Sequence, residues 1–232
     1  MSMLVLALVA FIGTHFLLSH PWRKPLVARL GENGFLVVYS LVAALTLGWV
    51  ILAYRAAPVV IWWVPPLFAY TLTHIGMIVA AILLVGSLVT PNPSLPKMGR
   101  AALQRMPTPQ GVFALTRHPM MWGIGLWGLV HAFVNGDAPT VVLAAGMAFL
   151  AIAGARGVDL KKRQQLGAAW QRFEQQTAFW PLAAQLRGRL PLSSLWPGWL
   201  PVMGGVALYV VLVYFHVALF GVAAVAPGTA LN

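Results

Sequence analysis

Residues 35–54 read FLVVYSLVAALTLGWVILAY, a run without a single charged side chain. A helix needs about 20 such residues to cross the roughly 30 Å hydrocarbon layer of a membrane. The rest of the 232-residue chain is similar, with 60% hydrophobic and 8% charged residues, where soluble domains have about 45–50% and about 25%. The composition therefore excludes a soluble globular protein and predicts an integral membrane protein.

Apolar runs long enough to be spans occur six times along the chain, at residues 3–19, 35–54, 61–89, 119–135, 138–157 and 199–223. The third run opens with two tryptophans and two prolines (residues 62–66), which are typical of a membrane interface, so its helix is expected over about 67–89. Asn135-Gly136-Asp137 predicts a tight turn before the fifth run. We expect an all-α, polytopic membrane bundle with six transmembrane helices in a single domain, residues 1–232.

The distribution of charge predicts the orientation of these spans. Fourteen of the 15 Lys and Arg residues fall in the three segments that share one side of the membrane if both termini lie on the other. Because cytoplasmic loops carry the excess of Lys and Arg, we expect both termini outside the cytoplasm. The first span has no cationic segment before it, which favours a retained helix over a secretory signal.

The segment between the fifth and sixth spans predicts an amphipathic helix at the membrane interface. Its apolar positions follow three- and four-residue spacing: Leu166, Trp170, Phe173, Thr177 and Trp180. Such a helix either anchors the protein on anionic lipid headgroups or forms a lid or dock for a ligand. Topology accounts for the net charge of +11, so membrane lipid is the expected partner and nucleic acid is not.

Four histidines lie in four different predicted spans, namely His15, His74, His131 and His216. At about 1.5 Å per residue, all four are expected in the central layer of the membrane. Neutral imidazole is a common metal ligand, and a heme iron takes one or two of them. The alternative is that each histidine hydrogen-bonds a neighbouring helix. A tetrahedral zinc site is less expected, because the chain has no cysteine and no carboxylate at that height.

The segment from Gly123 to Gly128 (GIGLWG) matches a dinucleotide-binding fingerprint by its letters. It follows no predicted strand and lies inside an apolar helix, so the match does not predict a nucleotide site. We expect these small residues to allow close packing of helices instead.

The segments 116–123 (TRHPMMWG), 126–131 (LWGLVH) and 135–137 (NGD) resemble the NnrU family. Gly13-Thr14-His15, His74 and residues 216–227 resemble it too, so the similarity covers nearly the whole chain. The family includes membrane proteins linked to nitrite and nitric oxide metabolism in denitrifying bacteria. It also includes the 15-cis-zeta-carotene isomerase of plants and cyanobacteria, which is a heme b enzyme.

The resemblance implies a heme b protein of the bacterial inner membrane. It implies His15 and His131 as axial ligands. From their place in the same membrane layer, His74 and His216 are alternates, and Arg117 and His118, at the inner edge of that layer, are further candidate cofactor-binding residues. The implied activity is cis–trans isomerisation of a lipid-soluble polyene; the alternative is a nonenzymatic membrane factor in nitrite and nitric oxide metabolism. Plant isomerases carry a cysteine three residues before the second histidine, where this chain has Gly128, so no thiolate ligand is implied.

A second, looser resemblance points to membrane methyltransferases of the isoprenylcysteine class. It rests on Arg117-His118-Pro119 and on the downstream residues Asp159, Leu166-Gly167, Trp170, Phe173 and Pro181. Those enzymes usually have a tyrosine near the first motif and paired glutamates before the amphipathic helix, where this chain has Met121 and Asp159. An S-adenosylmethionine-dependent methyltransferase is therefore the less favoured alternative. Arg117 is also explained as a cation that anchors the start of a helix at Pro119.

Overall fold

The computed structural model describes residues 1–224, and the predicted outer C-terminus at Asn232 lies outside that range. Within it the chain is helical, and Ile61 and Asp137 form a single isolated β-bridge. The long helices are α1 (Ser2–Ser19), α2 (Arg23–Arg55), α3 (Leu67–Val89), α6 (Pro119–Asn135), α7 (Ala138–Leu166) and α10 (Trp199–Tyr214). The predicted all-α class is confirmed.

Four of these helices, α1, α2, α3 and α7, are long and apolar enough to cross a membrane. The helices α6 and α10 are shorter, with 17 and 16 residues. Large apolar side chains are exposed along α2, including Val37, Leu41, Leu45 and Leu52, as expected where lipid is the solvent. The chain is therefore a helical membrane protein, while six crossings remain a prediction.

The helices α3 and α6 have the predicted bounds, but two others extend well beyond their apolar runs. Helix α2 begins at Arg23 and bends at Gly31, whose φ of +68° favours glycine. Helix α7 continues past residue 157 to Leu166, because the polar residues KKRQQL are good helix formers. The predicted span 199–223 is divided, since α10 ends at Tyr214 and α11 (His216–Phe220) follows.

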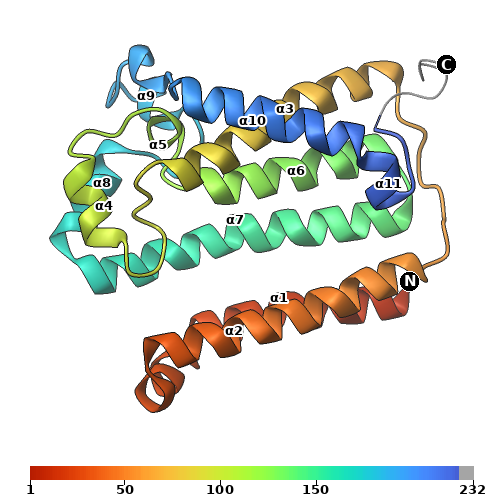
Figure 1. Cartoon of the computed structure of the whole chain (residues 1–232), viewed down its shortest axis with the longest axis horizontal. Helices are drawn as coiled ribbons and strands as arrows, with labels where there is room; N and C mark the ends of the chain where they lie inside the picture. Colours follow the sequence, from red (N-terminus) through yellow and green to blue (C-terminus); the bar gives the residue numbers. More distant parts are fainter. Residues whose placement is uncertain (225–232) are drawn as a thin grey trace.

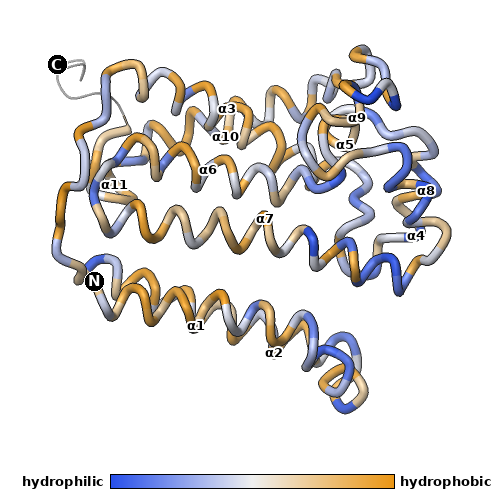
Figure 2. Tube along the Cα trace, turned by 180° about the vertical axis from the view of Figure 1, so that it is seen from behind, coloured by the Kyte–Doolittle hydropathy of each residue, from blue (hydrophilic) through white to orange (hydrophobic). Residues whose placement is uncertain are grey.

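Helix α7 lies between two groups of helices (Figure 1). On one side α6 packs on α7 and on α3, and α3 packs on α10; on the other side α1 packs on α2 and on α7. The short helices α4 (Gly99–Arg105), α5 (Val112–Leu115), α8 (Ala168–Gln176), α9 (Ala183–Leu186) and η1 (Leu192–Leu195) gather at one end of the bundle. Hydrophilic residues concentrate at this same end (Figure 2).

The glycines of α6 allow close contact with two neighbouring helices. A Cβ atom at Gly123 would lie 2.9 Å from the carbonyl oxygen of Ala80 in α3, and one at Gly128 would lie 2.5 Å from that of Ala144 in α7. Both distances are shorter than van der Waals contact, so no larger side chain fits without moving a helix. The prediction that these glycines serve helix packing is confirmed.

Helix α8 occupies part of the segment for which an amphipathic helix was predicted. Its aromatic residues Trp170 and Phe173 are buried and pack against Leu83, Val112 and Phe113. This aromatic face therefore contacts the protein's own core, whereas Trp180 lies beyond the helix and is exposed. An interfacial position of the whole segment remains a prediction.

Candidate functional site

A cavity of about 670 Å³ lies between the pair α1 and α2 and the pair α6 and α7. Such a volume is within the usual range of about 300–1,000 Å³ for pockets that bind small molecules. Much of its lining is apolar, from Phe11, Phe16, Phe35, Leu36, Met121, Ile124, Met147, Leu150 and Ala151. These walls suit an apolar ligand.

One end of this cavity is cationic. Arg23, Lys97, Lys161 and Lys162 line it, with Glu32 as the carboxylate among the lining residues. Arg23 is paired with Glu32 at 2.7 Å, and the ammonium of Lys162 donates to the carbonyl of Leu95 at 2.8 Å. The remaining positive charge suits a ligand that has an anionic group at one end of an apolar body.

Three histidines line the same cavity: His15, His20 and His118. The Nδ1 atom of His15 lies 2.7 Å from the carbonyl oxygen of Phe11. Because a carbonyl can only accept, Nδ1 carries a proton, and in the neutral tautomer the lone pair is on Nε2. A backbone carbonyl that fixes the tautomer in this way is the usual outer partner of a metal-ligating histidine.

His118 is 1% exposed and its Nε2 atom lies 2.8 Å from Oδ1 of Asp159. In this geometry Nε2 donates to the carboxylate, and Nδ1 is a buried atom without a hydrogen-bond partner in the described chain. Burial lowers the pKa of His118, against the opposing effect of Asp159. The side chain is therefore a neutral imidazole with a free lone pair beside the cavity.

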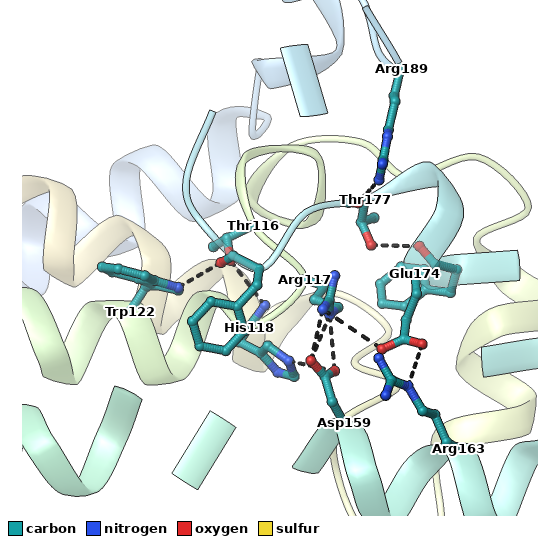
Figure 3. Close-up of polar contacts among 11 residues, drawn as sticks. Thr116, Arg117, His118, Trp122, Asp159, Arg163, Glu174, Thr177 and Arg189 are labelled. Carbon is teal, nitrogen blue, oxygen red and sulfur yellow. Dashed lines mark hydrogen bonds and ion pairs between the residues drawn. The ribbon is translucent and has the colours of Figure 1, made fainter. Parts of the chain in front are cut away.

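Asp159 is held by Arg117 as well as by His118 (Figure 3). The guanidinium of Arg117 donates to both carboxylate oxygens, with Nε 2.9 Å from Oδ1 and Nη2 2.8 Å from Oδ2. Arg117 is 9% exposed and also lies 3.7 Å from Glu174. The charge of Arg117 is therefore satisfied inside the protein at the start of α6.

The segment that carries these residues is fixed to the segment after α8. The carbonyl of Phe179 accepts from Thr116 Oγ1 at 2.7 Å and from Trp122 Nε1 at 2.8 Å. The backbone N–H of Arg117 donates to the carbonyl of Ala178 at 2.9 Å. These bonds connect residues about 60 positions apart in the sequence and hold Arg117 and His118 in place.

The remaining candidate histidines do not line the cavity. His131 bonds the carbonyl of Trp127 through Nδ1 at 2.9 Å, and it lies seven residues, about 10 Å, beyond Ile124 along α6. His74 bonds the hydroxyl of Tyr209 at 2.9 Å, which is the interhelical hydrogen bond of the alternative interpretation. His216 bonds the carbonyl of Val222 at 2.7 Å.

The structure thus brings His15 and His118 to one cavity and places Arg117 directly behind His118. Within residues 1–224, no group of three or more His, Asp or Glu side chains is placed to hold a metal ion. A metal in this region would depend on one or two protein ligands.

The pairing of His15 with His131 remains a prediction. The contact between Asp159 and His118 was not predicted, since residue spacing does not show which loop meets α7.

Comparison with protein families then identifies the relatives of this chain. Residues 3–224 match the family model described as NnrU protein. The chain belongs to the NnrU family. Among curated proteins, the chloroplastic 15-cis-zeta-carotene isomerase of Zea mays is 30% identical over 84 residues. That match covers 36% of this chain and 23% of the maize protein. No solved structure matches the chain significantly.

Proposed function

We propose that this NnrU-family protein binds heme b in the large cavity and isomerises a lipid-soluble polyene from cis to trans. One observation carries the proposal: an apolar middle, a histidine with an unused ring nitrogen and a cationic end occur together in one cavity. A heme combines an apolar ring with two anionic propionates. The chemistry of the cavity fits that group.

The residues that would hold the heme follow from this fit. His15 would ligate the iron through Nε2, because its Nδ1 proton is bonded to Phe11. The propionates would lie toward Arg23, Lys97 and Lys161 at the cationic end. For a second ligand, His131 is the residue implied by the family resemblance. His118 is the alternative, because it lines the cavity and its Nδ1 atom has no hydrogen-bond partner in the described chain.

Bound heme would supply an iron that, once reduced, can interact with a polyene double bond and lower its bond order. The protein's own task is to orient the two molecules and to exclude water. Phe11, Phe16 and Phe35 provide apolar walls for this purpose. A lipid-soluble substrate would reach the site directly from the membrane. We propose six crossings of a bacterial inner membrane with both termini outside the cytoplasm. This topology would place the cationic end of the cavity on the cytoplasmic side.

The isomerase part of the proposal rests on the named activity of the maize relative. It is tested with purified, heme-loaded and reduced protein, a poly-cis carotene in detergent, and chromatography of the products. We expect conversion to a trans isomer by the wild type and by His74→Ala, whose histidine bonds Tyr209 outside the cavity, but not by His15→Ala. A reduced, heme-loaded wild type that leaves the carotene unchanged would contradict the isomerase proposal.

A nonenzymatic membrane factor in nitrite and nitric oxide metabolism is the second candidate. The position of Gly128 favours it, because a Cβ there would lie 2.5 Å from the carbonyl of Ala144. The cysteine of the plant isomerases would not fit here without moving α7. A deletion strain that grows poorly on nitrite, together with purified protein inactive on carotenes, would favour this candidate.

The methyltransferase alternative receives less support from the geometry. Asp159 is the acidic residue on which that resemblance depends, and both of its oxygens are bonded to Arg117 and His118. It is therefore not free to bind the polar groups of S-adenosylmethionine.

A further inference from the structure

A second, smaller cavity of about 240 Å³ lies at the polar end of the bundle. It opens between the start of α6, the end of α8 and the turn after α9, and it shares no lining residue with the large cavity. Its lining includes Arg117, Arg163, Arg187 and Arg189 with a single carboxylate, that of Glu174, and Figure 3 shows several of these side chains. No lysine lines it.

Two of the four arginines of this cavity are paired with carboxylates and two are not. Arg117 is paired with Asp159 and Arg163 with Glu174. Arg187 and Arg189 contact no carboxylate within the described chain, and Arg189 donates to the carbonyl of Thr177 at 3.3 Å. The two oxygens of Glu174 are taken up by the other pair of arginines, since Oε1 lies 3.7 Å from Arg117 and Oε2 accepts from Arg163 at 2.7 Å. The cavity therefore holds two exposed cations, Arg187 and Arg189, that no carboxylate of the described chain neutralises.

The backbone fixes the position of these two arginines. Helix α9 is followed by Gly188, whose φ of +66° turns the chain sharply. The N–H of Gly188 donates to Gln185 at 2.9 Å and that of Arg189 to Ala184 at 2.8 Å, and Leu190 packs in a small apolar cluster below the turn. Arg187 and Arg189 thus extend from a defined turn and not from an unstructured loop.

We propose that this cavity is a binding site for a phosphate group. Guanidinium groups match the geometry of phosphate oxygens with paired hydrogen bonds, and arginine is preferred over lysine where that geometry matters. A lipid headgroup is one source, since exposed Trp180 lines the cavity and exposed Leu182 and Leu186 adjoin its lining residues Ala183 and Arg187 in the chain. Basic pockets on the cytoplasmic side suit anionic lipids. A soluble phosphate monoester is the other source. This site does not depend on the heme proposal.

The test measures ligand binding to delipidated, detergent-purified full-length protein by native mass spectrometry. The probes are phosphatidylglycerol, a diacylglycerol with the same acyl chains but no phosphate, and glycerol 3-phosphate. The site variant is Arg187→Gln with Arg189→Gln. The matched control is Arg100→Gln with Arg172→Gln, which removes the same charge from two exposed arginines outside both cavities.

We expect the apparent affinity for phosphatidylglycerol to fall about tenfold in the site variant and less than twofold in the control, and diacylglycerol to bind neither. Glycerol 3-phosphate that binds with the same dependence on Arg187 and Arg189 would identify the soluble source. Equal losses in both variants, or no loss in the site variant, would overturn the proposal. Should the double variant misfold, Arg187→Gln alone serves, because Arg187 makes no side-chain hydrogen bond or ion pair in residues 1–224.

Discussion

The orientation and tautomer of His118 depend on two partners, Asp159 and, through it, Arg117. Arg117 binds both oxygens of Asp159, and one of these oxygens accepts the Nε2 proton of His118. This arrangement fixes the tautomer of the imidazole and leaves Nδ1 without a hydrogen-bond partner in the described chain. The carboxylate therefore positions His118 and at the same time neutralises a buried arginine.

Asp159→Asn tests this role of the carboxylate. The change leaves Arg117 buried with weaker compensation, so the free energy of unfolding should fall by about 3 kcal/mol, measured by thermal denaturation in detergent. Glu32→Gln is the matched control, because the Arg23–Glu32 pair is more exposed and should contribute less than about 1 kcal/mol. Equal losses in the two variants would contradict the assignment.

The stability of the protein should also depend on the protonation of His118. Burial lowers its pKa below the ordinary value of 6.5, so below pH 6.5 the unfolded chain binds a proton that the folded chain does not. Stability is therefore highest above pH 6.5 and decreases as the pH falls below it. Melting temperatures between pH 7.5 and 5.5 should decrease less steeply for His118→Gln than for the wild type, and parallel curves would contradict this account.

The sequence indicates which polar side chains are unusual for a membrane protein, but it does not indicate which residues they contact in the fold. His15 and His118 are expected cofactor-binding residues and both line the large cavity. His74 was an alternate ligand, yet it bonds Tyr209, because a hydrogen bond between helices depends on a contact that is not local in sequence. Arg187 and Arg189 were counted as cytoplasmic charges, and their cavity forms through a turn that residue spacing does not predict.

Helix bounds were predicted well where an apolar run begins or ends at a proline or glycine. The bounds of α3 and α6 match, since Pro66 precedes α3, Pro119 is the first residue of α6, and Gly136 ends α6 with a φ of +71°. The ends of α2 and α7 were missed. An apolar run marks the part of a helix suited to lipid, whereas the helix itself continues through polar residues that favour the same backbone.

Gly128→Ala tests the contact between α6 and α7. The added Cβ would lie 2.5 Å from the carbonyl of Ala144, so the helices must separate and the free energy of unfolding should fall by about 1–3 kcal/mol. Gly13→Ala is the control, because no atom lies within 4 Å of its added Cβ and alanine favours a helix. A Gly128→Ala protein as stable as Gly13→Ala would show that the helices are not so close.

For the whole molecule, composition and periodicity suffice to predict a helical membrane protein. They do not predict the grouping of α1 and α2 on one side of α7 (Figure 1), and hence not the cavity between the groups. Since the cavity forms between residues distant in sequence, its lining follows from the packing of helices. The gathering of polar residues at one end of the bundle (Figure 2) agrees with the expected asymmetry of charge.

The orientation in the membrane can be tested with single cysteines, because the chain has none of its own. We expect Ala56→Cys, in the turn after α2, to react with a membrane-impermeant maleimide on intact spheroplasts. Gln171→Cys, exposed on α8, should react only after the membrane is permeabilised. Labelling of both positions, or of Gln171→Cys alone, on intact spheroplasts would contradict the proposed topology.

The most direct test of the central proposal is the optical spectrum of protein purified with heme supplied, oxidised and then reduced with dithionite. The wild type and the control His74→Ala should show a Soret band that shifts on reduction. The band should be lost or strongly weakened in His15→Ala, and its behaviour in His131→Ala and His118→Ala identifies the second ligand. A wild type without a Soret band, or a band unchanged in His15→Ala, would contradict a heme held by His15 in this cavity.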